Sequence, residues 1–160
     1  MSCLEVPLIG KPLWTSGDVL LRAELDLLMK DNGGARQAVS SRVDSGTEMT
    51  LMPAALAGSL DLPMPRAPVH GGLELMGGRR EVRVGLLRTR IDGMDPTEHV
   101  FPCYFIGDPE VPFDLNQPPI FPRALLGLTG VVDKIRLSFD GTADMDHPHG
   151  LLIVEEIVPE

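Results

Sequence analysis

Alternating apolar and polar residues constrain the fold of this chain more than any other feature. Between residues 18 and 29, every odd position from Val19 to Met29 is apolar, and positions 22, 24 and 26 carry charged side chains. Because successive side chains of a β-strand point to opposite faces, this pattern predicts a half-buried strand. Residues 31–34 (DNGG) favour a turn, and residues 36–43 are a second strand candidate. We therefore expect a β-hairpin over residues 18–43.

Short strand candidates recur along the rest of the chain, at residues 47–52, 99–106, 135–139 and 151–158. A long hairpin is expected between residues 69 and 91, and its apolar positions change phase near Leu86 and Leu87, which predicts a β-bulge. One helical turn is expected at residues 53–57, because Pro53 suits the first position of a helix. Residues 107–122 contain five prolines and are expected to be irregular.

The sequence shows no internal repeat and no clear domain boundary, so we expect one mostly-β domain over residues 1–160, with its core at residues 18–140. A chain of 160 residues can bury a core without disulfide staples. The 17 glycines and 15 prolines favour short elements joined by turns. Aromatic residues make up only 4% of the chain, which predicts a core of Leu, Val, Ile and Met.

Charge and cysteine usage exclude several functional classes. The net charge of −9 at pH 7 argues against non-specific binding to nucleic acid or to an anionic membrane, since both require a basic surface. Cys3 and Cys103 form no CxxC motif, and the N-terminus has no basic or long apolar segment. No apolar run approaches the roughly 20 residues of a membrane span. We expect a soluble cytoplasmic protein.

The stretch at residues 42–53 (RVDSGTEMTLMP) places a carboxylate, a hydroxyl and a glycine between two apolar segments. Asp, Ser and Gly are common turn formers, so a surface turn is the simplest interpretation. The alternative is a catalytic carboxylate on a tight loop. Two features favour this alternative: Val43 precedes Asp44, and an apolar-apolar-glycine segment follows much later in the chain.

This order of motifs resembles the retropepsin-like aspartic proteases, which are the retroviral proteases and their single-domain relatives in bacteria and eukaryotes. Their pattern is apolar-Asp-(Thr/Ser)-Gly-Ala-(Asp/Glu)-x-(Thr/Ser), then a glycine-bearing flap hairpin, then apolar-apolar-Gly. Here it corresponds to VDSGTEMT at residues 43–50, a hairpin around Gly77 and Gly78, and LLG at residues 125–127. The resemblance covers roughly residues 18–140. It implies an all-β, closed barrel of the acid-protease type, with one lobe per chain, a flap hairpin and one or two short helices at most.

The resemblance also implies an aspartic endopeptidase in which Asp44 activates a water molecule. Two carboxylates about 3 Å apart cannot both ionise, so such a pair shares one proton. The chain contains one DSG; DGT at residues 140–142 has the wrong order, and DGM at residues 92–94 lacks the hydroxyl. The second carboxylate must then come from a second copy, which implies a homodimer. Neither a cofactor nor a metal is expected.

Neighbouring residues receive roles from the same resemblance. Ser45 and Gly46 support the catalytic loop. Thr47 and Glu48 line a groove whose main chain pairs with an extended peptide or protein substrate. The remaining roles belong to two later segments: Met76, Gly77 and Gly78 form the flap tip, and Leu125, Leu126 and Gly127 pack behind the catalytic loop.

Departures from the family pattern leave other interpretations open. Leu128 stands where family members often carry Arg, so we expect Glu48 to lack its usual partner. The same fold can also serve as a non-catalytic peptide- or protein-binding module, or as an oligomerisation domain. Retroviral enzymes dimerise through terminal strands, and here residues 3–9 and residues 151–158 both qualify. Residues 144–149 (DMDHPH) favour a solvated turn over a metal site, because no distant His or Cys set accompanies them.

Overall fold

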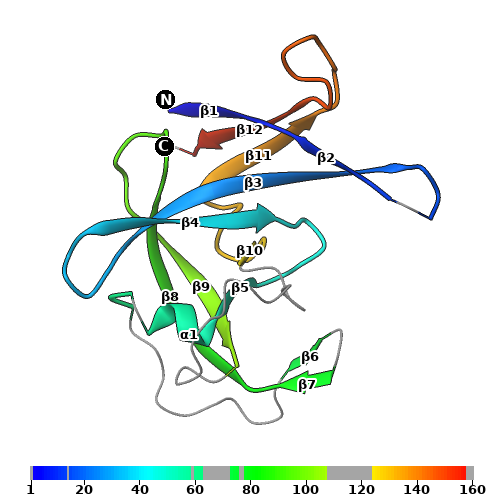
Figure 1. Ribbon diagram of the computed structural model, residues 1–160. Helices are drawn as coiled ribbons and strands as arrows, with labels where there is room; N and C mark the ends of the chain where they lie inside the picture. The colour runs from blue at the N-terminus through cyan, green and yellow to red at the C-terminus, as the bar shows by residue number, and fades with distance from the viewer. Residues whose placement is uncertain are drawn as a thin grey trace.

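The computed structural model describes residues 2–13, 15–58, 60–62, 73–75, 78–107 and 124–157 (Figure 1). Strands dominate these residues, and their one helix, α1 (Ala54–Ala57), has a single turn. The mostly-β character predicted from the sequence is confirmed. The strands in chain order are β1 (Cys3–Pro7), β2 (Ile9–Pro12), β3 (Val19–Lys30), β4 (Arg36–Val43), β5 (Thr50–Pro53), β6 (Leu73–Leu75), β7 (Gly78–Arg80), β8 (Val82–Ile91), β9 (His99–Ile106), β10 (Leu125–Leu126), β11 (Ile135–Asp140) and β12 (Leu151–Glu156).

The largest sheet contains seven strands in the order β2-β3-β4-β10-β5-β9-β8. β3 and β4 form the hairpin that the alternation predicts, with Ala23 opposite Val43 and Lys30 opposite Arg36. At the other end of the sheet, β8 pairs back onto β3, where Ile91 lies opposite Leu27. The sheet therefore curls back on itself and encloses the core between its strands.

The core contains the odd-numbered face of β3 from Ala23 to Met29, all of it buried. Val19 and Leu21 belong to the same predicted face but are 50% and 48% exposed, so their predicted burial is wrong. They lie where β3 pairs with β2, in an arm that extends away from the rest of the molecule (Figure 1). The prediction of a core without aromatic residues is also wrong, because Phe101 and Phe105 on β9 are fully buried.

A second sheet joins the two ends of the chain. It has the order β1-β12-β11, with Cys3 opposite Glu155 and Leu137 opposite Val154. Leu152 and Val154 in the central strand are fully buried against the main core. Both terminal segments that the sequence offered for dimerisation therefore pair with each other inside one chain.

Two local predictions differ from the structure. β8 and β9 pair without interruption from Val82–Ile106 to Thr89–His99, so the β-bulge predicted near Leu86 is absent. Leu86 belongs instead to the outer face of β8, which is exposed. The strand predicted to begin at residue 47 begins at Thr50, because residues 47 and 48 bond to a distant segment described below. Residues 108–122 of the predicted irregular segment lie outside the described part of the chain. Among the described residues, no helix is long and apolar enough to cross a membrane.

Candidate functional site

Asp44 is the first residue after β4 and is half-buried. β10 runs parallel to β4, with Leu126 beside Val43, and the Asp44 N–H donates a hydrogen bond of 3.1 Å to the Leu126 carbonyl. Figure 1 shows the short β10 lying next to the end of β4. The fold thus brings the DSG and LLG motifs together, although they are far apart in the sequence.

The Asp44 carboxylate is oriented by its own loop. Its Oδ1 accepts a 2.9 Å hydrogen bond from the Gly46 N–H, and its Oδ2 accepts a 2.9 Å hydrogen bond from the Thr47 hydroxyl. The Thr47 N–H donates to the Asp44 carbonyl at 3.2 Å. An Asp that accepts from the N–H two residues ahead forms an ordinary Asx turn. These bonds alone therefore suit both a surface turn and a positioned catalytic carboxylate.

The LLG segment binds the same loop from behind. Leu128 donates its N–H to the carbonyls of Thr47 and Glu48 at 3.1 and 3.0 Å, and Thr129 donates to Glu48 at 2.7 Å. The Glu48 carbonyl therefore accepts two hydrogen bonds and has no lone pair left for a peptide, whereas the Thr47 carbonyl accepts one from the described residues and retains a free lone pair. Leu128 thus contacts Glu48 through its main chain, at the position where the family often has an Arg.

Gly127 occupies the tightest point of this contact. Its N–H donates to the buried Thr50 hydroxyl at 3.2 Å. A Cβ atom at Gly127 would lie 2.8 Å from the Thr50 nitrogen and still closer to the main chain of Met49. Real Cβ atoms do not approach backbone so closely, so only glycine fits here. Leu125 and Leu126, which precede it, are buried at 7% and 1% exposure.

The predicted flap is described only in part. Met76 and Gly77 lie outside the described residues. Gly78 begins β7 and lies opposite Leu75 of β6, so a hairpin is present at the predicted position. These two strands form a sheet of their own. The described contacts do not join this hairpin to the Asp44 loop.

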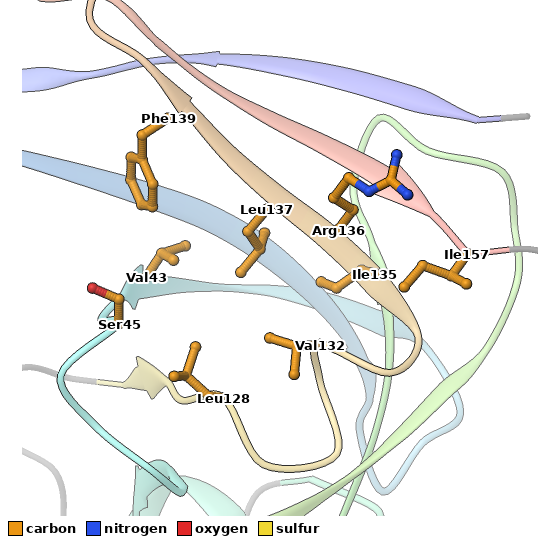
Figure 2. Close-up of a pocket in the computed structure, with 9 residues that line it drawn as sticks. All are labelled: Val43, Ser45, Leu128, Val132, Ile135, Arg136, Leu137, Phe139 and Ile157. Atoms are coloured by element: carbon orange, nitrogen blue, oxygen red, sulfur yellow. The ribbon is translucent and has the colours of Figure 1, made fainter.

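An open pocket of about 420 Å³ lies next to the loop and was not predicted from the sequence. Figure 2 shows side chains of β11 on one side of it and Val43, Ser45 and Leu128 on the other. Its other lining residues are Val132, Ile135, Arg136, Leu137, Phe139 and Ile157. The alternation at residues 135–139 did predict an apolar face on this strand, but sequence alone does not show that Phe139 is left 53% exposed.

Other reactive groups in the described residues lie apart from this loop. Burial raises the pKa of the Cys103 thiol to about 12, which keeps it protonated and unreactive near neutral pH. The His99 ring stacks on the Phe101 ring. Its Nε2 atom lies 3.2 Å from Glu156 Oε1, which is close enough for an ion pair, but the two groups are not aligned for a hydrogen bond. This pair of buried His99 and partly buried Glu156 joins β9 to β12. It was not predicted from the sequence, because its two members are distant in the chain.

The acidic and histidine-rich segment at residues 144–149 forms a turn. The N–H groups of Asp146 and His147 donate to Asp144 Oδ1 at 2.8 and 2.6 Å. Bonds from His147 lower the pKa of the Asp144 carboxyl. Within the described part of the chain, no three His, Cys, Asp or Glu side chains are grouped to hold a metal ion.

Comparisons with protein-family models, curated proteins and solved structures found no match to this chain.

Proposed function

We propose that this chain is a cytoplasmic, retropepsin-like aspartic endopeptidase that acts as a homodimer, with Asp44 of each copy forming the catalytic pair. The observation that carries the proposal is the hydrogen-bonded contact between the Asp44 loop and the LLG segment. A simple surface turn does not require a buried strand behind it, nor a glycine packed against the main chain of a neighbouring segment. The return of β8 to β3 supports the closed barrel that this family implies.

Peptide hydrolysis then follows from two carboxylates that share one proton. The ionised Asp44 takes a proton from a water held between the two copies, and the water oxygen attacks the peptide carbonyl carbon. The protonated carboxyl gives its proton to the carbonyl oxygen, which forms a tetrahedral diol. A proton then passes to the amide nitrogen as the C–N bond breaks, and no covalent enzyme intermediate forms.

The local hydrogen bonds support this role by orienting the carboxylate. Gly46 and Thr47 each bind one Asp44 oxygen, which fixes the plane of the carboxyl group. A carboxylate has about four lone-pair sites, so both oxygens can still accept a bond from water. Thr47 therefore acts as a positioning residue for Asp44, in addition to any contact with substrate.

The decisive test is Asp44→Asn, compared with Asp31→Asn as a matched control. Asp31 Oδ1 also accepts the N–H of the glycine two residues ahead, at 2.9 Å, but it lies at the β3–β4 turn. We expect Asp44→Asn to lower peptide cleavage about 100- to 10,000-fold, because an amide cannot act as the general base. Cleavage of a peptide library between pH 4 and 7, followed by mass spectrometry, measures this. Equal cleavage by Asp44→Asn and the parent protein would rule out the mechanism.

A non-catalytic binding module is the second candidate. The observation that favours it is that the Asp44 carboxylate makes the bonds of an ordinary turn. On this hypothesis the parent protein binds extended peptides without cleaving them, and Asp44→Asn leaves their affinity unchanged. Fluorescence anisotropy with the same library separates this candidate from the protease.

A further inference from the structure

β11 lies at the edge of the three-stranded sheet, and β12 is its neighbour within the described residues. The Ile157 N–H donates to the Lys134 carbonyl at 2.9 Å. Because hydrogen-bonded pairs alternate along antiparallel strands, Arg136, Ser138 and Asp140 direct their main-chain groups toward β12. Leu137 and Phe139 then direct theirs to the other side, where none of the described strands pairs with β11 and another strand can do so.

The open edge of β11 borders the pocket beside the catalytic loop. Phe139 and Val132 are 53% and 51% exposed, although both are large and apolar. Figure 2 shows the Phe139 and Leu137 side chains directed toward the side of the pocket formed by Val43 and Ser45. An apolar surface beside an unpaired strand edge is typical of a protein interface.

The polar face of β11 is self-complementary in charge. Arg136 and Asp140 lie two residues before and after Ser138, and both are exposed. Arg136 has an ion-pair partner in Glu155 at 3.5 Å, but its side chain is 67% exposed, so this pair contributes little. The bond from the Thr142 N–H lowers the pKa of the Asp140 carboxyl, which stays ionised near neutral pH.

We propose that a second copy of this chain docks on the open edge of β11, with the two β11 strands antiparallel about a two-fold axis at Ser138. This register places Arg136 opposite the partner's Asp140 and Leu137 opposite the partner's Phe139. Each opposite-charge and apolar pair then occurs twice, as a two-fold interface requires. The choice of a second copy rests on the proposed function, because one chain supplies one half of the Asp44 pair.

The position of the pocket connects this interface to the candidate site. Ser45, the residue after Asp44, lines the same pocket as Phe139. A copy seated against β11 therefore borders the pocket that Ser45 also lines. The terminal strand β1 lies at the opposite edge of the sheet and is not the contact in this arrangement. The exposed apolar arm formed by β2 and the start of β3 is the competing surface, and it is not part of this pocket.

The first test compares Phe139→Lys with Leu20→Lys on the competing arm, where Leu20 is 49% exposed. Sedimentation equilibrium measures the dimer dissociation constant of each variant. We expect Phe139→Lys to weaken the dimer at least about 30-fold, as for a central interface residue, and Leu20→Lys to leave it unchanged. A monomeric parent protein, or a dimer that only Leu20→Lys dissociates, would overturn the proposal.

The second test fixes the register. Residues opposite each other in a non-hydrogen-bonded pair have Cα atoms about 4.5 Å apart, which is within the range of a disulfide. In a Cys3→Ser background, Ser138→Cys should give a covalent dimer under mild oxidation, whereas Ser40→Cys on the internal strand β4 should not. A dimer that resists cross-linking at Ser138 would refute this register.

A charge reversal tests the same register. Arg136→Asp should weaken the affinity of the dimer about fivefold, and adding Asp140→Lys should restore it.

Failure of the interface and failure of the proposed function give different results. If the β11 variants dissociate the dimer but Asp44→Asn retains full cleavage, the interface stands and the protease mechanism fails. If Asp44→Asn abolishes cleavage while the β11 variants leave the dimer intact, the mechanism stands and the interface fails.

Discussion

Asp31 and Asp44 lie in two turns that are alike in local hydrogen bonding and different in their surroundings. In each, Oδ1 accepts the N–H of the glycine two residues ahead at 2.9 Å. In each, Oδ2 accepts from a nearby side chain: Gln37 for Asp31 and Thr47 for Asp44. The carboxylate of Asp31 accepts hydrogen bonds from Gly33, Ala35 and Gln37, all within the β3–β4 hairpin. The Asp44 loop is also bonded along its main chain to Leu126, Leu128 and Thr129.

The comparison shows that the carboxylate's own hydrogen bonds do not distinguish a turn from a candidate site. Both turns also contact a distant segment, since Asn32 beside Asp31 donates a 3.2 Å hydrogen bond to the Gly58 carbonyl. The distinguishing feature is that the segment behind the Asp44 loop includes Gly127, whose Cα lies so close to the main chain of Met49 and Thr50 that no side chain fits. A change behind the Asp44 loop should therefore have larger effects than a matching change in the Asp31 turn.

The largest effect on stability is expected from Gly127→Ala. Its new Cβ would lie 2.8 Å from the Thr50 nitrogen, and main chain cannot move aside easily. We expect a loss of about 3 kcal/mol in the free energy of unfolding. The matched change is Gly33→Ala in the Asp31 turn, where the Cβ would lie 3.3 Å from Asp31 Oδ1. Because that neighbour is a side-chain atom, we expect a change below about 1 kcal/mol. Urea denaturation measures both, and equal losses would remove the distinction between the two turns.

A smaller effect, on activity rather than stability, is expected from Thr47→Val. The variant removes the hydroxyl that binds Asp44 Oδ2 and leaves the carboxylate less well oriented. We expect cleavage to fall about 10- to 100-fold, since small misplacements of a catalytic group are costly. The control is Gln37→Ala, which removes the matching donor from Asp31 and should leave cleavage unchanged. Cleavage assays with the best library peptide test the pair; full activity in Thr47→Val would argue against an oriented carboxylate.

Local features of the fold were predictable from the sequence, and contacts between distant segments were less so. Alternation placed the β3–β4 hairpin correctly, because it depends only on which side chains face the core, and the apolar run at residues 99–106 is β9. It could not show that Val19 and Leu21 lie in an arm beyond the core. Alternation also could not predict the pairing of β1 with β12 or the exposure of Phe139, because each depends on the position of another strand.

The candidate site shows the same limit. The DSG and LLG motifs were recognisable in the sequence, and the structure places them side by side. The sequence did not predict that Thr47 would bind the Asp44 carboxylate, or that the carbonyls of Thr47 and Glu48 would be occupied by Leu128 and Thr129. The bonds from Leu128 and Thr129 follow from the approach of two distant backbone segments, which residue types do not encode.

The smallest predicted effect concerns the titration of Asp31. The hydrogen bond from Gln37, followed by main-chain bonds from Ala35 and Gly33, lowers the pKa of the Asp31 carboxyl in the folded protein. Because the folded pKa is depressed, the stabilisation is present above the pKa of an unfolded Asp, about 3.9, and is lost as the pH falls through the folded value. Gln37→Ala should raise the pKa of Asp31 toward the ordinary value, as measured by NMR titration of its side-chain carbon. The destabilisation caused by this variant should therefore be present at neutral pH and disappear in acid. A pKa that does not move would show that Gln37 does not bind this carboxylate in solution, and Gln37→Ala would then not be a matched control for Thr47→Val.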